Sequence, residues 1–325
     1  MDVHTEPLRT ALLAGLRAPS PYNTQPWLFE VTGDRVDVVL DRDRVLAAAD
    51  PDAHEARLSC GAAILNIKLS LMAAGRAAVV RLLPDPARPD LLASVRVAGG
   101  RLAAPADQRL ALAIPRRHTN RRPFLDSPVP DYAKAELMRA AQAENAVLRI
   151  VERPAEVDAL ASMIRRGDHL QSQDPMYQNE LRRWVHGIAE RGDGVQLSSI
   201  GPTPDDTSLI VLRQFAEERA PARPFEQQPL LAVLTTPGDH PMDQVQAGQA
   251  MQRVLLTATD LGLCTSFLSQ PIEIPALRSA LRALLGIGRP HVVLRLGYGF
   301  AGVPARRRAL ADVLRVPAHE FAGGA

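Results

Sequence analysis

The segment Arg116-Arg117-His118-Thr119-Asn120-Arg121-Arg122-Pro123-Phe124 concentrates four arginines, a histidine and two short polar side chains in nine residues. An apolar run from Leu110 to Pro115 precedes this basic segment, and a helix-forming stretch from Tyr132 to Gln142 follows it. A guanidinium group presents a planar fork of donors that matches phosphate oxygens two at a time. The basic segment therefore predicts a site for a ligand with a phosphate and several polar ring or ribose atoms. The alternative interpretation is a solvated basic loop.

The composition of the whole chain is ordinary for a soluble globular protein. Its 325 residues are 46% hydrophobic and 23% charged, enough for one large or two modest domains. The net charge of +2 is too small to indicate binding to nucleic acid by overall electrostatic attraction. Only Lys68 and Lys134 are lysines, which leaves 38 − 2 = 36 arginines, so arginine is the default cation of this chain.

The cysteines and the N-terminus favour a reducing, aqueous location. Cys60 and Cys264 lie far apart in sequence and lack the spacing of a metal or redox pair. Nothing implies a disulfide framework. Residues 1–7 are polar and acidic, without the basic-then-apolar pattern of a signal peptide. No apolar run approaches the roughly 18 residues that would span a membrane. We therefore expect a cytoplasmic protein without a membrane or nucleic-acid partner.

Hydrophobic periodicity predicts alternating helices and short strands. Alternation on either side of a Gly33-Asp34 turn predicts a hairpin over 28–31 and 36–40. Further strands are expected at 79–83, 92–97, 147–151, 229–235 and 291–296, and helices at 8–17, 58–75, 134–142, 155–166 and 244–262. The polar, glycine- and proline-containing stretch 168–207 is expected to be an irregular lid with a helical piece at 175–190.

The two longest predicted helices can be superimposed on one another in sequence. Gly61 to Gly75 matches Gly248 to Gly262 at a fixed offset of 248 − 61 = 187, with coinciding apolar positions and glycines. The strands near Val97 and Leu296 stand in similar relation to these helices. Chance similarity of two periodic helices is the alternative. A real repeat predicts two related halves in one chain, with a ligand site at their seam.

The chain contains the motif Arg117-His118-Thr119-Asn120-Arg121, the loop Ser20-Pro21-Tyr22-Asn23-Thr24-Gln25-Pro26-Trp27 and a long helix-forming stretch at 247–263. Together these three motifs resemble the flavin-dependent nitroreductase superfamily. Arg117-His118-Thr119-Asn120-Arg121 resembles the basic element that holds the FMN phosphate and ribityl chain. Ser20-Pro21-Tyr22-Asn23-Thr24-Gln25-Pro26-Trp27 resembles a loop that reaches the flavin from the opposite subunit. Residues 247–263 resemble the long core helix, which leads into the loop at the flavin N5. In ordinary members the basic element comes first, whereas here the Asn-Gln-Pro-Trp loop does.

This order resembles the Acg-like branch, whose single chains contain two nitroreductase-type halves. The resemblance implies an α+β nitroreductase-like fold, a pseudo-dimer in which each half has a central mixed or antiparallel sheet flanked by helices. Residues 1–112 would form a degenerate first half and residues 113–325 the second half, with the lid as an insertion at about 168–207. The two halves would build a single complete site, in a protein that is a monomer or a homodimer.

The same resemblance implies which residues contact FMN. The phosphate and ribityl contacts would come from Arg117, His118, Thr119, Arg121, Arg307 and Arg308. The backbone of Leu268, Ser269 and Gln270 would lie at the N5 edge, and Arg223 would be the cation near the pyrimidine edge. Ser20, Pro21 and Asn23 would close the site from the first half. No side chain is predicted to act as a general acid, and no metal is expected.

The implied function is hydride transfer from NAD(P)H through FMN to a small nitro, quinone or related acceptor. Two alternatives stay open. The lid could cover the flavin, which would make the protein a flavin-binding or sequestering protein with little nitroreductase activity. The third interpretation is a biosynthetic flavin oxidase, which returns electrons from one specific metabolite to oxygen.

Overall fold

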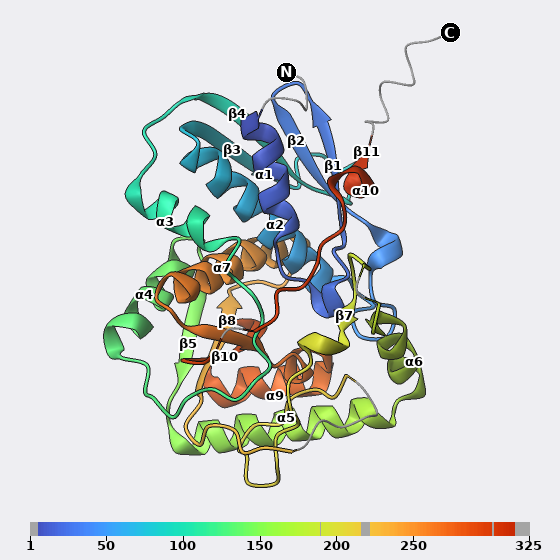
Figure 1. Ribbon diagram of the computed structural model, residues 1–325, viewed down its shortest axis with the longest axis vertical. Coiled ribbons are helices and arrows are strands. Elements are labelled where there is room, and N and C mark those ends of the chain that lie inside the picture. Colours follow the sequence, from blue (N-terminus) through green and yellow to red (C-terminus); the bar gives the residue numbers. More distant parts are fainter. Residues whose placement is uncertain (1–5, 189, 216–221, 301, 316–325) are drawn as a thin grey trace.

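The computed structural model describes residues 6–188, 190–215, 222–300 and 302–315, and these form two sheets around a central pair of helices. Figure 1 shows β1 to β4 in the upper half of the molecule and β5, β8 and β10 in the lower half. The arrangement is the expected α+β architecture, with helices packed against both sheets.

The first sheet has the order β11-β1-β2-β4-β3. Its strands are β1 (Trp27–Thr32), β2 (Arg35–Leu40), β3 (Arg76–Leu82), β4 (Leu91–Gly100) and β11 (Leu314–Arg315). The β1–β2 hairpin pairs Phe29 with Val38, two core residues, and turns at Gly33, which has a positive φ of 57°. All neighbours are antiparallel except β11, which lies parallel to β1. The end of the described chain thus adds a strand to the sheet that the beginning builds.

The second sheet is antiparallel throughout, in the order β5-β8-β10-β9. It consists of β5 (Val147–Val151), β8 (Leu230–Thr236), β9 (Cys264–Phe267) and β10 (Arg289–Gly297). A separate pair of two-residue strands, β6 (Val185–His186) and β7 (Val195–Gln196), belongs to the predicted lid. The central strands β8 and β10 are buried along almost their entire length, because helices cover this sheet.

The five helices predicted from periodicity are present, together with others that periodicity did not predict. They are α1 (Glu6–Leu16), α2 (His54–Ala73), α3 (Pro105–Ala113), α4 (Asp131–Gln142), α5 (Pro154–Gln173), α6 (Pro175–Trp184), α7 (Pro241–Asp260), α8 (Gln270–Glu273), α9 (Pro275–Leu285) and α10 (Leu310–Val313). Three short 3-10 turns are η1 (Pro21–Asn23), η2 (Arg42–Arg44) and η3 (Leu197–Ser199).

Helices α2 and α7 cross at two glycines. A Cβ atom on Gly61 would lie 2.1 Å from the carbonyl oxygen of Val245, and one on Gly248 would lie 2.1 Å from that of Leu58. Only glycine permits this approach of the two backbones. Beyond the crossing, Gln252 donates a hydrogen bond of 2.8 Å to Asn66 inside the core.

The length and apolar composition of α2 would suffice to cross a membrane, but 78% of its most apolar window is buried within the protein. Among the described residues it is the single helix that passes this test. Its position against α7, in the middle of the molecule, is that of a core helix.

The structure corrects one expectation about the lid. Irregular structure does not begin at Asp168, because α5 continues to Gln173. Gly167 lies inside this helix, where a Cβ would lie 2.7 Å from the side chain of Gln270, so its absence allows α5 to pack closely on α8. The non-helical part of the predicted lid begins at Val185, after α6.

Candidate functional site

Two adjoining cavities lie where the basic segment, the Asn-Gln-Pro-Trp loop and α2 meet. The large cavity encloses about 870 Å³ when the open space at its mouth is included, and its wall includes Pro21, Glu55, Ser269 and Gln270. The basic cavity encloses about 600 Å³ on the same basis. Four residues line both cavities: Pro19, Ser20, Thr119 and Arg121. The two cavities therefore form one elongated site, drawn from segments nearly 300 residues apart.

Cations dominate the basic cavity. Arg117 and Arg307 both line it together with Arg17. Burial, with a smaller contribution from nearby Arg17, lowers the pKa of Arg117 to about 10. Burial also lowers the pKa of Arg307 to about 9, with Arg117 and Arg17 as further causes. These guanidinium groups remain charged at pH 7 and repel one another.

Several nitrogen atoms of this arginine cluster lack partners. Within the described residues, Nε and Nη1 of Arg117 and Nε of Arg307 are buried without a hydrogen bond. The terminal nitrogens of Arg307 do donate to main-chain carbonyls, including those of Arg17 and Ala18 at 3.3 and 3.2 Å. Buried donors without acceptors are costly in a folded protein, so the cluster fits an anionic ligand.

The Asn-Gln-Pro-Trp loop reaches the basic cavity in an unusual backbone conformation. Tyr22, Asn23 and Gln25 have positive φ angles of 49°, 58° and 53°. Such angles are strained for residues other than glycine and cluster at functional sites. The loop is held by side chains: the Gln25 main-chain N–H donates to Ser20 Oγ at 2.9 Å, and Asn23 Nδ2 donates to the carbonyl of Arg306 at 3.1 Å.

The non-helical part of the lid lies against this loop and against the C-terminal tail, residues 302–315. Gln25 Nε2 donates to the carbonyl of Gly192 at 2.8 Å, and Asn23 Nδ2 to that of Gly194 at 3.2 Å. Asp193 forms an ion pair with Arg44. A Cβ atom on Gly192 would lie 2.8 Å from the carbonyl oxygen of Arg307, so lid and tail are in direct backbone contact.

His118 joins the basic segment to the tail. Its Nε2 accepts a hydrogen bond of 2.8 Å from the main-chain N–H of Gly302, and its Nδ1 lies 2.9 Å from the carbonyl of Arg116. The ring is therefore the neutral tautomer with the proton on Nδ1. Next to it, the Asn120 N–H donates to the Thr265 carbonyl at 2.8 Å, which anchors the basic segment to β9.

Most of the residues predicted for the site line these two cavities. Ser20, Pro21, Thr119, Arg121, Ser269 and Gln270 line the large cavity, and Ser20, Asn23, Arg117, His118, Thr119, Arg121 and Arg307 line the basic one. Three predicted residues line neither. Leu268 is buried in the core, Arg308 lies 3.6 Å from Asp41, and Arg223 is exposed.

Arg213 is a cavity residue that sequence reasoning missed. It lines the large cavity, its Nη2 donates to Glu273 Oε2 at 2.6 Å, and its guanidinium lies over the rings of Tyr22 and Tyr177 at 5.4 and 5.6 Å. Its Nε has no partner within the described residues. With 36 arginines in the chain, no sequence signal distinguishes Arg213.

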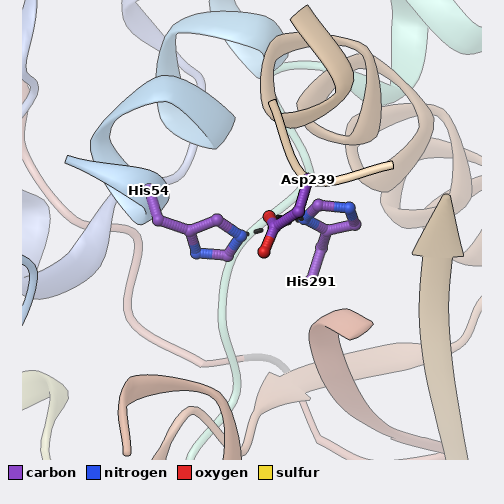
Figure 2. Close-up of side chains that lie close together, drawn as sticks. All are labelled: His54, Asp239 and His291. Atoms are coloured by element: carbon purple, nitrogen blue, oxygen red, sulfur yellow. Dashed lines mark hydrogen bonds and ion pairs between the residues drawn. The ribbon is translucent and has the colours of Figure 1, made fainter. Parts of the chain in front are cut away.

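A second polar cluster, shown in Figure 2, adjoins the large cavity, because its member His291 lines the cavity wall. His54 Nε2 is 2.9 Å from His291 Nδ1, and the ligand atoms of His54, Asp239 and His291 lie within 4.8 Å of one another, as in a metal site. However, Arg278 Nη2 lies 3.2 Å from His54 Nε2 and 2.9 Å from Asp239 Oδ1. The guanidinium already supplies the positive charge, so the cluster is a hydrogen-bonded network.

The two histidines of this network make stability depend on pH. Burial lowers the pKa of His54 well below its usual value, and burial with the Arg278 charge lowers that of His291 to about 4. Between pH 6.5 and 4 the unfolded chain therefore binds protons that the folded protein does not, so stability falls as pH falls through this window. His291 alone accounts for roughly 2 kcal/mol of lost stability between pH 7.5 and 5.

We expect His291→Gln to flatten the slope of stability against pH, so that about 2 kcal/mol less stability is lost between pH 7.5 and pH 5 than in the unmodified protein. The measurement is the difference in the free energy of urea unfolding between these two pH values. The exposed His169 provides the matched control, His169→Gln, which should retain the slope of the unmodified protein. An unchanged slope in His291→Gln would mean that this imidazole is not held neutral in the folded state.

Comparison with known proteins identifies the family. The family model described as "Nitroreductase family" matches residues 114–300, which is 300 − 114 + 1 = 187 of the 325 residues. "Putative NAD(P)H nitroreductase MT3217" of Mycobacterium tuberculosis (strain CDC 1551 / Oshkosh) is 32% identical over 98% of this chain and 94% of its own length. "Putative NAD(P)H nitroreductase acg" of the same strain is 30% identical over 91% and 90%.

A solved structure of a nitroreductase with bound FMN from Desulfitobacterium hafniense DCB-2 is 14% identical and covers 64% of this chain and 98% of its own, with a TM-score of 0.41. The family predicted from the three local motifs is confirmed by the family model and the two mycobacterial relatives. The chain belongs to the nitroreductase family and is an oxidoreductase of the nitroreductase type.

Proposed function

We propose that this protein binds one FMN across the two adjoining cavities and passes hydride from NAD(P)H to a small nitro, quinone or related acceptor. The observation that carries the proposal is the convergence of Arg17, Arg117 and Arg307 on the basic cavity, with buried guanidinium nitrogens that lack acceptors among the described residues. The names of two relatives, which specify NAD(P)H, support this reductant.

The basic cavity fits the phosphate of FMN. A phosphate dianion would accept hydrogen bonds from Arg117 Nε and Nη1 and from Arg307 Nε. Its charge would offset the burial and the mutual repulsion that lower the pKa values of these arginines. Thr119 and Arg121 line both cavities, so they would lie along the ribityl chain. Arg308 would act indirectly, because its guanidinium contacts the carbonyl of Gln25 and not the cavity.

The large cavity would receive the flavin ring, which supplies hydride acceptance and two-electron transfer when bound. Ser269 and Gln270 form one wall, and Ser20 and Pro21 another, so the ring would be enclosed between α8 and the loop before β1. We assign the cation near the ring to Arg213 in place of Arg223, since Arg213 lines the large cavity and Arg223 does not. A positive charge there would favour the anionic reduced ring.

The proposed reaction is tested by adding NAD(P)H to the FMN-loaded protein without oxygen. Rapid loss of the yellow colour, followed by its return on addition of a quinone or nitroaromatic compound, is the expected result. Free FMN at the same concentration is the control. Persistent colour over the time of turnover would contradict hydride transfer and favour the second candidate function.

The second candidate function is flavin sequestration, and the lid favours it. Hydrogen bonds from Asn23 and Gln25 and the ion pair between Arg44 and Asp193 hold the lid on the basic end of the site. A lid in this position would slow exchange of the bound flavin. The colour test separates the two functions, because a sequestering protein would retain its flavin without rapid reduction.

We further propose that residues 1–112 and 113–325 are two related halves, which explains why one chain builds one site. The contacts of α2 with α7 support this duplication. Gly61 and Gly248, related by the offset of 187, meet at the crossing. Arg57 and Gln244 have the same offset, 244 − 57 = 187, and form a hydrogen bond of 2.9 Å. Contacts between equivalent positions are what a pseudo-twofold axis requires.

A further inference from the structure

Glu55 is a carboxyl group in the wall of the large cavity that the proposed binding of FMN does not use. It lies in the first turn of α2 and comes from the opposite half of the chain to α8. Its Oε2 is buried and has no hydrogen-bond partner in the described part of the protein. The Ser269 hydroxyl, at the N-cap of α8, faces the same carboxyl. A buried acid at this place requires either a partner or a proton.

The charges around Glu55 favour the protonated form. Asp50 precedes α2 and accepts a hydrogen bond from the main-chain N–H of Glu55 at 2.9 Å, and the Glu273 carboxylate on α8 has the largest effect on Glu55 of the surrounding charges. Arg213 is the facing cation, but its Nη2 is paired with Glu273 at 2.6 Å. The phenol of Tyr22, on η1, completes the surroundings and is itself buried.

Burial and these two carboxylates raise the pKa of Glu55 well above its usual value, despite the opposing effects of Arg213 and Ser269. The surroundings of Glu55 therefore favour its protonated carboxyl form, beside the proposed position of the reactive ring edge. A neutral carboxyl can donate a hydrogen bond and then a proton to a carbonyl or nitro oxygen. Glu55 is the only carboxyl group in the wall of the large cavity among the described residues.

We propose that Glu55 is the acid that protonates the acceptor oxygen during reduction in the large cavity. This assignment rests on the proposed function. Reduction of a quinone to a hydroquinone adds two electrons and two protons. The two electrons and one proton arrive together as a hydride, which NAD(P)H provides when it is oxidised to NAD(P)⁺. Glu55 donates the remaining proton: the O–H bond of Glu55 breaks, and an O–H bond forms on the acceptor. The bonding electrons remain on the Glu55 carboxylate, which solvent reprotonates.

The substrate class follows from this geometry. The acceptor should carry a carbonyl or nitro oxygen that reaches Glu55 while its reducible atom faces the ring edge near Ser269 and Gln270. An acceptor that takes electrons without protons, such as ferricyanide, gains nothing from the acid. Comparing the two kinds of acceptor therefore isolates the contribution of Glu55.

The first measurement compares acceptors in the FMN-loaded Glu55→Gln variant, which retains the shape of the side chain but has no acidic proton. The ratio of the quinone rate to the ferricyanide rate is expected to fall by roughly 10²–10⁴, the usual contribution of a general acid. Glu55→Asp, which restores an acid on a shorter chain, should recover part of the ratio. The exposed Glu136 on α4 gives the control Glu136→Gln, with an unchanged ratio. An unchanged ratio in Glu55→Gln would overturn the assignment.

The second measurement needs neither flavin nor turnover. Infrared difference spectroscopy of the flavin-free protein at pH 7.5 should show the C=O stretch of a protonated carboxylic acid, and this band should be absent in Glu55→Gln. A band that survives in the variant, or no band in the original protein, would overturn the assignment. Failure to bind FMN is a separate result: it would reject the proposed function, and the catalytic role of Glu55 with it, whatever the infrared band shows.

Discussion

Replacing Arg117 with alanine is expected to raise the Kd for FMN roughly 100-fold. Arg117 has two buried nitrogens without acceptors among the described residues, and each charge-assisted hydrogen bond to phosphate contributes about 1.5–3 kcal/mol. A loss of about 3 kcal/mol corresponds to that change in Kd. Quenching of flavin fluorescence during titration of the flavin-free protein measures it directly.

The same substitution should leave the flavin-free protein as stable as before or more stable. Arg117 has a pKa of about 10, below its usual value, because burial and Arg17 disfavour its charge, so its cation opposes folding at neutral pH. The exposed neighbour Arg116 provides the control Arg116→Ala, which should bind FMN normally. Equal FMN affinity in Arg117→Ala and Arg116→Ala would reject the phosphate assignment.

The second large effect is expected at the crossing of α2 and α7. Gly61→Ala would place a methyl group 2.1 Å from the carbonyl oxygen of Val245, and two core helices would have to separate. We expect a loss of more than about 3 kcal/mol in the free energy of unfolding, at the upper end of overpacking effects. Urea denaturation gives the value, provided that the variant still folds.

The matched control is Gly99→Ala on β4, where an added Cβ meets nothing within 4 Å among the described residues. This variant should unfold within about 1 kcal/mol of the original protein. Gly248→Ala disrupts the same crossing, so the double variant with Gly61→Ala should cost less than the sum of the two single changes. A Gly61→Ala variant as stable as Gly99→Ala would contradict the close approach of the helices.

Much of the fold could be predicted because its elements carry strong local signals. The β1–β2 hairpin alternates around a glycine turn, and the strand predicted at 147–151 has the bounds of β5. Other elements depend on distant partners. The four residues of β9 are held by pairing with β10, and β11 exists because the tail returns to β1. Such pairing leaves no periodic pattern in four residues or fewer.

Some residues of the candidate site could likewise be predicted from local motifs, whereas others are brought there only by the tertiary fold. Arg117 and Asn23 belong to recognisable motifs, and both line the basic cavity. Arg213 and Glu55 line the large cavity from segments without a motif, so only the folded chain brings them there. The expectation that no general acid exists followed from the motifs alone. The raised pKa of Glu55 depends on its burial and on the charges of Glu273 and Asp50, and Glu273 is more than 200 residues away in sequence. Sequence spacing cannot report that environment.

The most direct test of the account is the stoichiometry of FMN binding to the purified flavin-free protein. The arginine cluster and the Asn-Gln-Pro-Trp loop each occur once per chain, and both line the one elongated site. Titration followed by flavin fluorescence or calorimetry should therefore reach saturation at one FMN per chain. Saturation at two per chain, or no binding at all, would contradict a single flavin site built from both ends of the sequence.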